Sequence, residues 1–357
     1  MLIYLLVVSL ILIFQDQVHG IKSQLLRERA ENRFLLMICC ILVLLAALRG
    51  STVGTDTAGY ILEYDVTSSY SLKEILIRKA DFPGYYILSK ICLQLHLSIQ
   101  MFFGIVEGIY VYSIYKFTSR FSEDKLYTIL CFEMIGLYSF SLAGLKQTLS
   151  MAFVLLYYLA LIDKKYILTV MYAFVAYQCH HASLIFLFGV ALYFIRNWKI
   201  YYLSLFVVVL FALFGTNFIW TNMLDLLSSE HYTKSYTEDE GYANTTMIFY
   251  GVLLLMLFLF SANYRKQKKE ESKLVLGMST LAFAFQAISF ISSAAFRLSY
   301  YFLPLMIVGF PNAFNKIRDK DLGKVVKYVV AFMIVFFFVY ANRNGGSVVP
   351  YKFFWQE

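Results

Sequence analysis

Long apolar runs, separated by short polar links, extend along nearly the whole chain. A helix that crosses about 30 Å of hydrocarbon needs about 20 mostly apolar residues. The runs predict helices near residues 2–14, 34–48, 99–117, 126–144, 148–162, 166–178, 182–195, 200–220, 247–264, 274–292, 298–314 and 324–341. Several of these runs are shorter than the length that a membrane-spanning helix needs. Such helices can tilt differently or extend into neighbouring polar residues. The pattern therefore predicts an all-α, polytopic integral membrane bundle of about 12 transmembrane helices.

Composition agrees with this class. Of 357 residues, 60% are hydrophobic and 15% are charged, which excludes an ordinary soluble domain. Runs such as the one at 332–340, FMIVFFFVY, do not alternate as the strands of a membrane barrel would. The net charge of +8 would suggest nucleic-acid binding in a soluble chain. Here most basic residues lie in short links between spans, so no nucleic-acid partner is expected.

The basic links predict the orientation of the chain. Most of its 31 lysines and arginines lie in the links at 22–33, 116–125, 164–165, 196–199, 265–273 and 316–327. Because positively charged links remain cytoplasmic, these links are expected inside and both termini outside. Residues 84–97, GYYILSKICLQLHL, are apolar enough to cross, but a crossing would place the link at 116–125 outside. We therefore expect an outer-surface or re-entrant helix there.

This topology gives one membrane domain, residues 1–357, with three large outward elements. They are the loop 49–98, which holds the surface or re-entrant helix, the loop 221–246, and the tail 342–357. The sequence contains no Walker motif, GxGxxG, CxxC or HExxH, so neither a cofactor nor a metal is expected. The five cysteines are odd in number and lie in apolar segments, where small core residues are the simplest interpretation.

Five polar segments are expected to converge on the outer membrane boundary. They are Arg49 to Tyr60, Lys146 with Gln147, His180 with His181, Arg297 with Tyr300 and Tyr301, and the tail from Arg343 to Trp355. Charged side chains beside hydrocarbon are costly unless they face water, a partner or a polar substrate. Several cations with a histidine suit a lipid-linked phosphate or pyrophosphate.

Each of these residues also has a purely structural interpretation. Arg49 can anchor the end of a span at the interface, and Asp56 can cap a helix that begins near Ala58. Lys146 can extend its ammonium to the headgroups, although a cation at the start of a helix interacts unfavourably with the helix dipole. Glu107 and Glu133, within two predicted spans, can be neutral, paired or exposed to a cavity.

Four segments carry a resemblance to a known family. They are LRGSTVGTDTAGY at 48–60, LAGLKQTLSMAFVLLYYLALIDKKY at 142–166, AYQCHHASLIFL at 176–187 and FRLSYYFLP at 296–304. Their order and spacing resemble the EpsG family of Wzy-like polysaccharide polymerases over most of the chain. The family usually has Arg before the residue that matches Gln147, whereas this chain has Lys146, which keeps the charge but loses the two-pronged geometry of Arg. His181 fits the family's His-x-Ser pattern through Ser183 and is preferred to His180.

The resemblance implies a fold like that of GT-C and Wzy-like membrane glycosyltransferases. It implies a polymerase without cofactor or metal that acts at the outer face of the bacterial cytoplasmic membrane. The donor and the acceptor would both be oligosaccharides on undecaprenyl pyrophosphate, and a chain-length regulator would be a partner. Capsular polysaccharide, exopolysaccharide or O-antigen would be the product.

The residue types suit this chemistry. Arg49, Lys146 and Arg297 would bind the pyrophosphate and stabilise the leaving group. His181 or Asp56 would accept the proton of the attacking hydroxyl. Supporting roles would fall to Gln147, Tyr60, His180 and Tyr300.

Other functions remain open from the sequence. A flippase or transporter of the same lipid-linked sugar would also need outward cations, although transporters usually have inverted repeats and broken helices. A glycan ligase or a sugar acyltransferase at the outer face is a further alternative.

Overall fold

The computed structural model describes residues 1–215, 243–289, 295–345 and 347–356. It forms two compact units, one of residues 1–180 with 331–357 and the other of residues 181–330. All regular elements in these ranges are helices, and the remaining pairing is a single antiparallel bridge between Arg49 and Phe353. The all-α prediction is therefore confirmed for the described residues.

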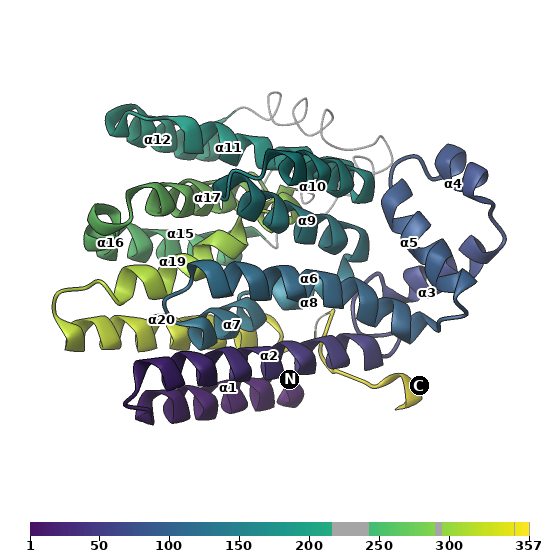
Figure 1. Cartoon of the computed structure of the whole chain (residues 1–357), viewed down its shortest axis with the longest axis horizontal. Helices are drawn as coiled ribbons and strands as arrows, with labels where there is room; N and C mark the ends of the chain where they lie inside the picture. The colour runs from purple at the N-terminus through teal and green to yellow at the C-terminus, as the bar shows by residue number, and fades with distance from the viewer. Residues whose placement is uncertain (216–242, 290–294, 346, 357) are drawn as a thin grey trace. The chain divides into compact units, whose positions relative to one another are not determined.

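The first unit is built around four long helices that pack in succession. The helices are α2 (Gln24–Leu48), α6 (Ile99–Phe121), α9 (Leu145–Ile162) and α10 (Tyr166–Cys179). Both α1 (Leu2–Gly20) and α7 (Lys125–Met134) pack on α2. Three short helices, α3 (Thr57–Ser68), α4 (Leu72–Arg78) and α5 (Pro83–Gln94), lie together at the end where α2 stops and α6 begins (Figure 1). The helix expected within 84–97 is thus present as α5, and its depth in the membrane stays a prediction.

The contact between α2 and α6 depends on small residues. Gly104 and Gly108 lie one turn apart on α6, and a methyl group added at Gly104 would come within 3.1 Å of the Ala47 Cβ on α2. A methyl group at Gly108 would lie 4.0 Å from Val43, one turn earlier on α2. Small residues at this spacing let two helix backbones approach closely without a bulky side chain between them. Side chains that flank the glycines are therefore held directly against the end of α2.

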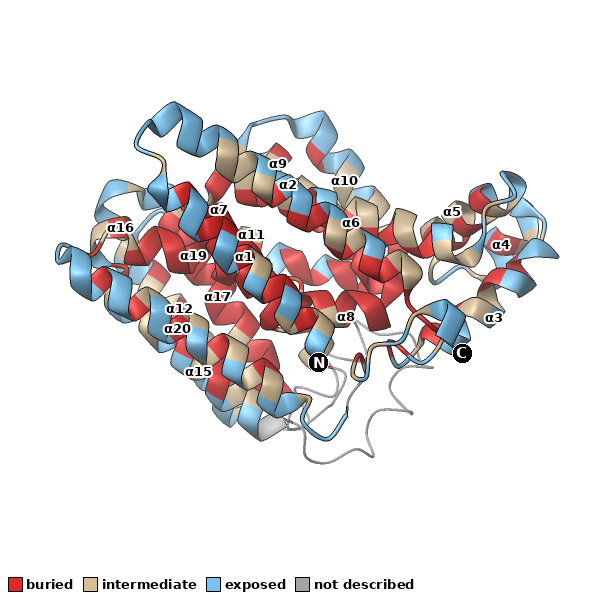
Figure 2. Ribbon diagram, turned by 90° about the horizontal axis from the view of Figure 1, so that it is seen from below, coloured by how far each residue is buried: buried red, intermediate tan, exposed pale blue. Residues whose placement is uncertain are grey.

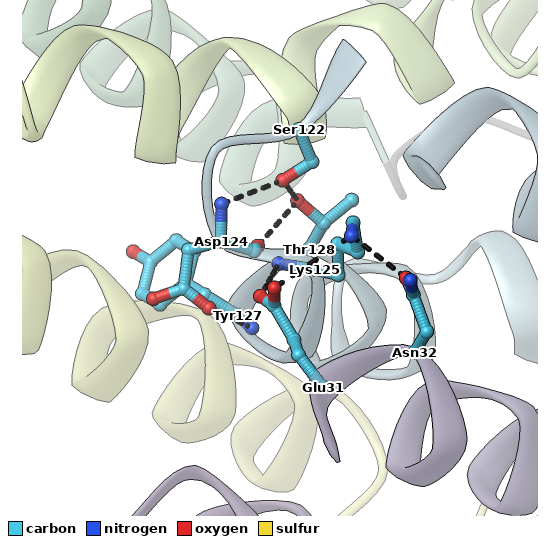
Figure 3. A network of polar contacts seen from close by, with 7 residues as sticks. All are labelled: Glu31, Asn32, Ser122, Asp124, Lys125, Tyr127 and Thr128. Atoms are coloured by element: carbon cyan, nitrogen blue, oxygen red, sulfur yellow. Dashed lines mark hydrogen bonds and ion pairs between the residues drawn. The ribbon is translucent and has the colours of Figure 1, made fainter. Parts of the chain in front are cut away.

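A polar network joins the opposite end of α2 to the start of α7 (Figure 3). The Asp124 carboxylate caps α7 by accepting a hydrogen bond from the Tyr127 N–H at 3.0 Å. The Lys125 N–H donates to Glu31 at 2.7 Å, and the Lys125 Nζ donates to Asn32 at 2.7 Å. The links at 22–33 and 116–125, predicted to lie on the same side, therefore meet in the structure.

The predicted helix at 126–144 is broken. It consists of α7 and α8 (Leu137–Ala143), which are bent by 50°. Gly136 at the break has φ +107°, a left-handed conformation that glycine adopts without steric cost. The break turns the chain into the start of α9, where Lys146 lies.

The second unit is organised around α17 (Lys269–Ile288), whose residues are buried from Ser272 onward. The helices that pack on it are α11 (Phe186–Phe194), α12 (Trp198–Phe214), α15 (Ala243–Phe260), α16 (Ala262–Gln267), α18 (Ala295–Ser299) and α19 (Leu303–Phe314). A 3₁₀ turn, η1 (His181–Ile185), precedes α11. Helix α20 (Lys320–Ala341) begins in this unit and ends in the first. Figure 2 shows the buried α17 and α19 and the exposed faces of α1 and α20.

The count of about 12 spans is not confirmed. Four helices, α1, α2, α9 and α20, are long and apolar enough to cross a membrane, and α7 with α8 makes a fifth if the bent pair is one span. Most other expected spans are apolar helices of only 10–17 residues. Helix α6 is long enough, but Glu107 and several tyrosines make it less apolar. The ends of the spans predicted at 200–220 and 274–292, and most of the loop 221–246, lie outside the described residues.

A glycine allows the tight turn in the loop that follows α2. Gly54 has φ +99°, and a methyl group there would collide with the Leu142 carbonyl oxygen at the end of α8. Thr57 is the first residue of α3, and its hydroxyl donates a hydrogen bond to the Val53 carbonyl at 2.6 Å. Gly54 thus serves the backbone turn, as its place in a polar loop suggests.

Replacement of Gly54 by Ala should destabilise the purified protein by about 1–3 kcal/mol, because the residue is left-handed and has no space for a Cβ. The matched control is Gly59→Ala on α3, where a Cβ would meet nothing within 4 Å. That change should leave the Tm unchanged or raise it, since alanine favours a helix. Thermal unfolding in detergent measures both, and equal Tm values for the two variants would contradict this account of the loop.

Candidate functional site

Arg49, the first residue after α2, is enclosed in the first unit. Its side chain is only 1% exposed, and its Nη1 donates to the Ala46 carbonyl at 2.5 Å. The guanidinium carbon lies 4.0 Å from the centre of the Phe103 ring of α6. Its Nε and Nη2 have no hydrogen-bond partner among the described residues. A buried cation with unused donors is unusual, because each unused donor costs free energy, and such a group is a strong candidate to bind an anion.

The C-terminal tail covers the Arg49 loop. The Gly50 N–H donates to the Lys352 carbonyl at 2.9 Å, and the Gly54 N–H donates to the Ser347 carbonyl. The Tyr351 hydroxyl donates to the Leu45 carbonyl at 2.6 Å and so satisfies an acceptor at the end of α2. These bonds fix the tail, which was predicted to face outward, against the loop that carries Arg49.

Tyr351 shows how apolar this covered region is. Burial raises the pKa of Tyr351 to about 12, although the neighbouring Arg49 cation opposes the shift. The Tyr351 ring packs edge-on against Tyr4 of α1, with 6.0 Å between ring centres. Tyr4 in turn donates to the Val348 carbonyl at 3.0 Å. The tail is thus held by side chains from both α1 and α2.

Glu107 is the acidic partner of this region. It is fully buried on α6, one turn after Phe103, and interacts electrostatically with Arg49. One of its oxygens accepts a hydrogen bond from Ser141 of α8 at 2.9 Å. The other, Oε2, has no hydrogen-bond partner in the part of the chain that the structure describes. Glu107 and Arg49 therefore both retain unused hydrogen-bonding capacity.

Lys146 lies in an aromatic cage in the same unit. Its Nζ is 5.0 Å from the ring centres of Phe82 and Tyr86, and 5.5 Å from those of Tyr60 and Tyr85. Each ring face attracts a cation, by about 0.5–2 kcal/mol depending on solvent exposure. We call these four rings the Lys146 cage. They come from α3, from α5 and from Phe82, which precedes α5, so the short helices of the 49–98 loop build the cage.

Glu63 of α3 completes the cage. Its Oε1 accepts a hydrogen bond from Lys146 Nζ at 2.9 Å and another from the Tyr86 hydroxyl at 3.0 Å. The Lys146 side chain is 12% exposed and that of Glu63 is 32% exposed, so the pair lies at the edge of the unit's interior. A pair at this depth is less screened than a surface pair, and its geometry is that of a charge-assisted hydrogen bond.

The other predicted residues of the first unit lie around these two cations. Asp56 occupies the N-cap position of α3 without a side-chain capping bond, and it interacts electrostatically with Lys146. Gln147 is buried beside Lys146 on α9. The His180 ring lies 5.3 Å from that of Phe82, a member of the Lys146 cage. The fold therefore brings together four of the predicted residues, Asp56, Tyr60, Lys146 and His180. The Asp56 side chain does not form the hydrogen bond that would cap α3.

The remaining predicted residues lie in the second unit. His181 begins η1, which contacts α18, the short helix that carries Arg297. The Arg297 guanidinium carbon is 6.0 Å from the Phe296 ring, and Tyr300 packs edge-on against the same ring. Ser183, which completes the His-x-Ser pattern, is buried, and its hydroxyl lacks a partner among the residues described here. His181 and Arg297 therefore share one region, while His180, its neighbour in sequence, packs in the first unit.

Sequence reasoning missed Glu63 and the aromatic residues of α5. A helical signal was present, because Glu63 follows Asp56 by seven residues and Tyr60 by three, which places the three on one face of a helix. Tyr85 and Tyr86 fall within 84–97, which was predicted to be an outer-surface or re-entrant helix, and Phe82 precedes it. Nothing in the sequence indicates that their rings surround a lysine sixty residues later.

No group of three or more His, Cys, Asp or Glu side chains within the described ranges is arranged to hold a metal ion. The five cysteines are all free thiols, and Cys40 is exposed on α2, so its expected place in the core is wrong.

The pairing of Lys146 with Glu63 can be tested by a double-mutant cycle. Lys146→Met should lower stability by about 1–3 kcal/mol, because it leaves the Glu63 carboxylate without its cation. The double variant with Glu63→Gln should recover part of the loss, with a coupling of about 0.5–3 kcal/mol. The control, Lys165→Met, removes an exposed ion pair with Asp163 beyond the far end of α9 and should change the Tm little. Additive single effects would contradict the pairing.

Comparisons with known proteins bear on the identity of the chain. The sequence profile of the EpsG family matches residues 32–353, which includes both units and every predicted site residue. No curated protein matches the chain significantly. No solved structure matches it either. The family match covers nearly the whole chain, and the chain therefore belongs to the EpsG family, as a membrane protein of polysaccharide biosynthesis.

Proposed function

We propose that the protein is a polysaccharide polymerase that transfers a growing glycan from undecaprenyl pyrophosphate to a repeat unit on the same carrier. A hydroxyl of the acceptor sugar attacks the anomeric carbon of the donor, and undecaprenyl pyrophosphate leaves. The reaction takes place at the outer face of the bacterial cytoplasmic membrane. Capsular polysaccharide, exopolysaccharide or O-antigen is the product.

The observation that carries this proposal is the state of Arg49. Its guanidinium is buried, and two of its nitrogens have no hydrogen-bond acceptor among the described residues. A pyrophosphate oxygen supplies the kind of acceptor that a guanidinium fork binds best. The leaving group carries concentrated negative charge, so a fixed cation that is already desolvated stabilises the transition state without reorganisation.

Access to Arg49 requires movement of the tail in this proposal. Residues 347–353 lie over the loop, so the tail must release its backbone bonds to Gly50 and Gly54 and the hydroxyl bonds of Tyr351 and Tyr4. Lys146 supplies a second cation in the same unit. Arg297 and His181, which lie near each other in the second unit, are proposed as further substrate-binding residues.

A flippase or transporter of lipid-linked oligosaccharide is the second candidate. The bend of 50° between α7 and α8 favours it, because broken helices line the substrate path of many transporters. Both functions require the protein to bind the same lipid-linked anion. They differ in whether a glycosidic bond forms.

Purified protein in liposomes should lengthen lipid-linked repeat units without nucleotide. Chelation of divalent metal should leave the rate unchanged, since fixed cations supply the positive charge. Arg49→Ala should slow elongation by about 10²–10³-fold, the loss seen when one transition-state donor is removed. Arg49→Lys should retain part of the activity because it keeps the charge. Glycan products resolved by length on a gel measure all of these rates.

The control is Arg78→Ala on α4, an exposed arginine whose side chain is 62% accessible. It should elongate as the wild type does. In cells, Arg49→Ala or Arg297→Ala should leave expression intact and cap the surface glycan at one repeat unit. Loss of even single exported units would refute the polymerase and favour transport.

A further inference from the structure

We propose that Glu63 is the general base of the reaction, a role that rests on the proposed glycosyl transfer. Glu63 lies on α3, on the same helical face as Tyr60, and its carboxylate belongs to the Lys146 cage. General bases of glycosyl transfer must reach the attacking hydroxyl directly or through one water. Among the acidic residues around the two cations of the first unit, Glu63 combines partial exposure with a fixed position.

The two oxygens of Glu63 are in different situations. Oε1 accepts hydrogen bonds from Lys146 at 2.9 Å and from the Tyr86 hydroxyl at 3.0 Å, so two donors hold the carboxylate. Oε2 makes no hydrogen bond to any residue that the structure describes, although it is enclosed. One oxygen is therefore used for orientation, and the other retains its full capacity to accept a proton.

Other acids near the cations are less suited to this role. Glu107 interacts with Arg49, but it is 0% exposed, and Ser141 already occupies one of its oxygens. Asp56 lies at the N-cap position of α3 and interacts with Lys146 through its charge, whereas the Glu63 carboxylate accepts hydrogen bonds from both Lys146 and Tyr86. The Glu63 side chain is 32% exposed through its other atoms, and Oε2 is enclosed, so a sugar hydroxyl reaches Oε2 only after the bound pyrophosphate has drawn Lys146 away.

The ion pair couples substrate binding to the availability of the base. While Glu63 and Lys146 form their ion pair, each charge partly cancels the electrostatic effect of the other on a bound substrate. A pyrophosphate that binds Lys146 competes with Glu63 for the same three ammonium donors. The carboxylate then keeps the Tyr86 hydrogen bond and loses its cation, so it becomes a better proton acceptor when the donor substrate is in place.

The step balances as follows. The acceptor hydroxyl gives its proton to Glu63 Oε2, and its oxygen forms a bond to the anomeric carbon of the donor. The bond between that carbon and the pyrophosphate oxygen breaks, and its electron pair remains on the pyrophosphate, beside Arg49 and Lys146. The proton on Glu63 returns to water after the lengthened glycan has moved on.

Elongation kinetics of Glu63→Gln test the assignment. The amide preserves shape and can still accept from Tyr86, but it cannot take a proton. We expect kcat to fall by about 10²–10⁴-fold. The KM for the lipid-linked donor should stay within about threefold of the wild-type value. The Tm should fall by no more than it does for Lys146→Met, which breaks the same ion pair. Glu63→Asp should restore part of kcat, because it returns a carboxylate at a longer reach.

The pH profile provides a readout that a structural role would not change. The wild-type kcat should fall as the medium is acidified, and this dependence should be absent from the residual activity of Glu63→Gln. Lys146, Tyr86 and Tyr85 interact with Glu63 directly. Tyr60, Lys79 and Asp56 interact with Lys146, and His180 packs on Phe82 of the Lys146 cage. Tyr86→Phe should weaken the orientation of the carboxylate and lower kcat without removal of the acid limb.

Asp65→Asn is the matched control, since Asp65 is an exposed carboxylate on the same helix. It should behave as the wild type in rate and in pH profile. If Glu63→Gln elongates at the wild-type rate, or loses Tm and substrate binding together with kcat, Glu63 is not the base. If the wild-type protein lengthens no lipid-linked glycan, the polymerase proposal itself fails and the assignment of Glu63 fails with it.

Discussion

The close approach of α2 and α6 is the constraint on which the Arg49 region depends. Gly104 and Gly108 remove side-chain bulk from α6 at the contact with Ala47 and Val43. The residues just before these glycines, Phe103 and Glu107, then meet the arginine that follows α2. The same two glycines that pack the helices therefore set the distance between a buried cation, its aromatic neighbour and its acidic partner. A methyl group at Gly104 would press on the Ala47 Cβ at 3.1 Å, whereas one at Gly108 would make an ordinary van der Waals contact with Val43.

The two cations of the first unit are stabilised in different ways. Arg49 donates to one backbone carbonyl, packs against one ring and interacts with the Glu107 carboxylate, but its Nε and Nη2 have no hydrogen-bond acceptor among the described residues. Lys146 has four rings and a direct carboxylate partner. A lysine suits this site, because a compact ammonium fits a closed cage better than a planar guanidinium does. Arg49 can thus bind an anion directly, whereas Lys146 must release the Glu63 carboxylate before it binds another anion.

The sequence predicted where helices and polar loops lie better than it predicted which side chains contact one another. The periodicity of apolar residues located nearly every helix, and the polar run at 48–60 located Arg49, Asp56 and Tyr60. It did not predict the break at Gly136, because a left-handed glycine within an apolar run has no compositional signal. Nor did it predict that Glu63 would pair with Lys146, since that contact joins helices more than eighty residues apart. Long-range pairs between polar residues depend on packing geometry, which composition does not encode.

The pairing of the tail with the Arg49 loop has a consequence for biogenesis. The Tyr351 hydroxyl and the Leu45 carbonyl are 306 residues apart in sequence, and the intervening helices must all be synthesised before they can meet. Throughout translation, the carbonyls at the end of α2 and the amides of Gly50 and Gly54 need temporary partners, such as water at the membrane surface. The enclosure of Arg49 is therefore among the last events of folding, and a ribosome that stops early leaves a protein whose helices are inserted but whose arginine is still uncovered.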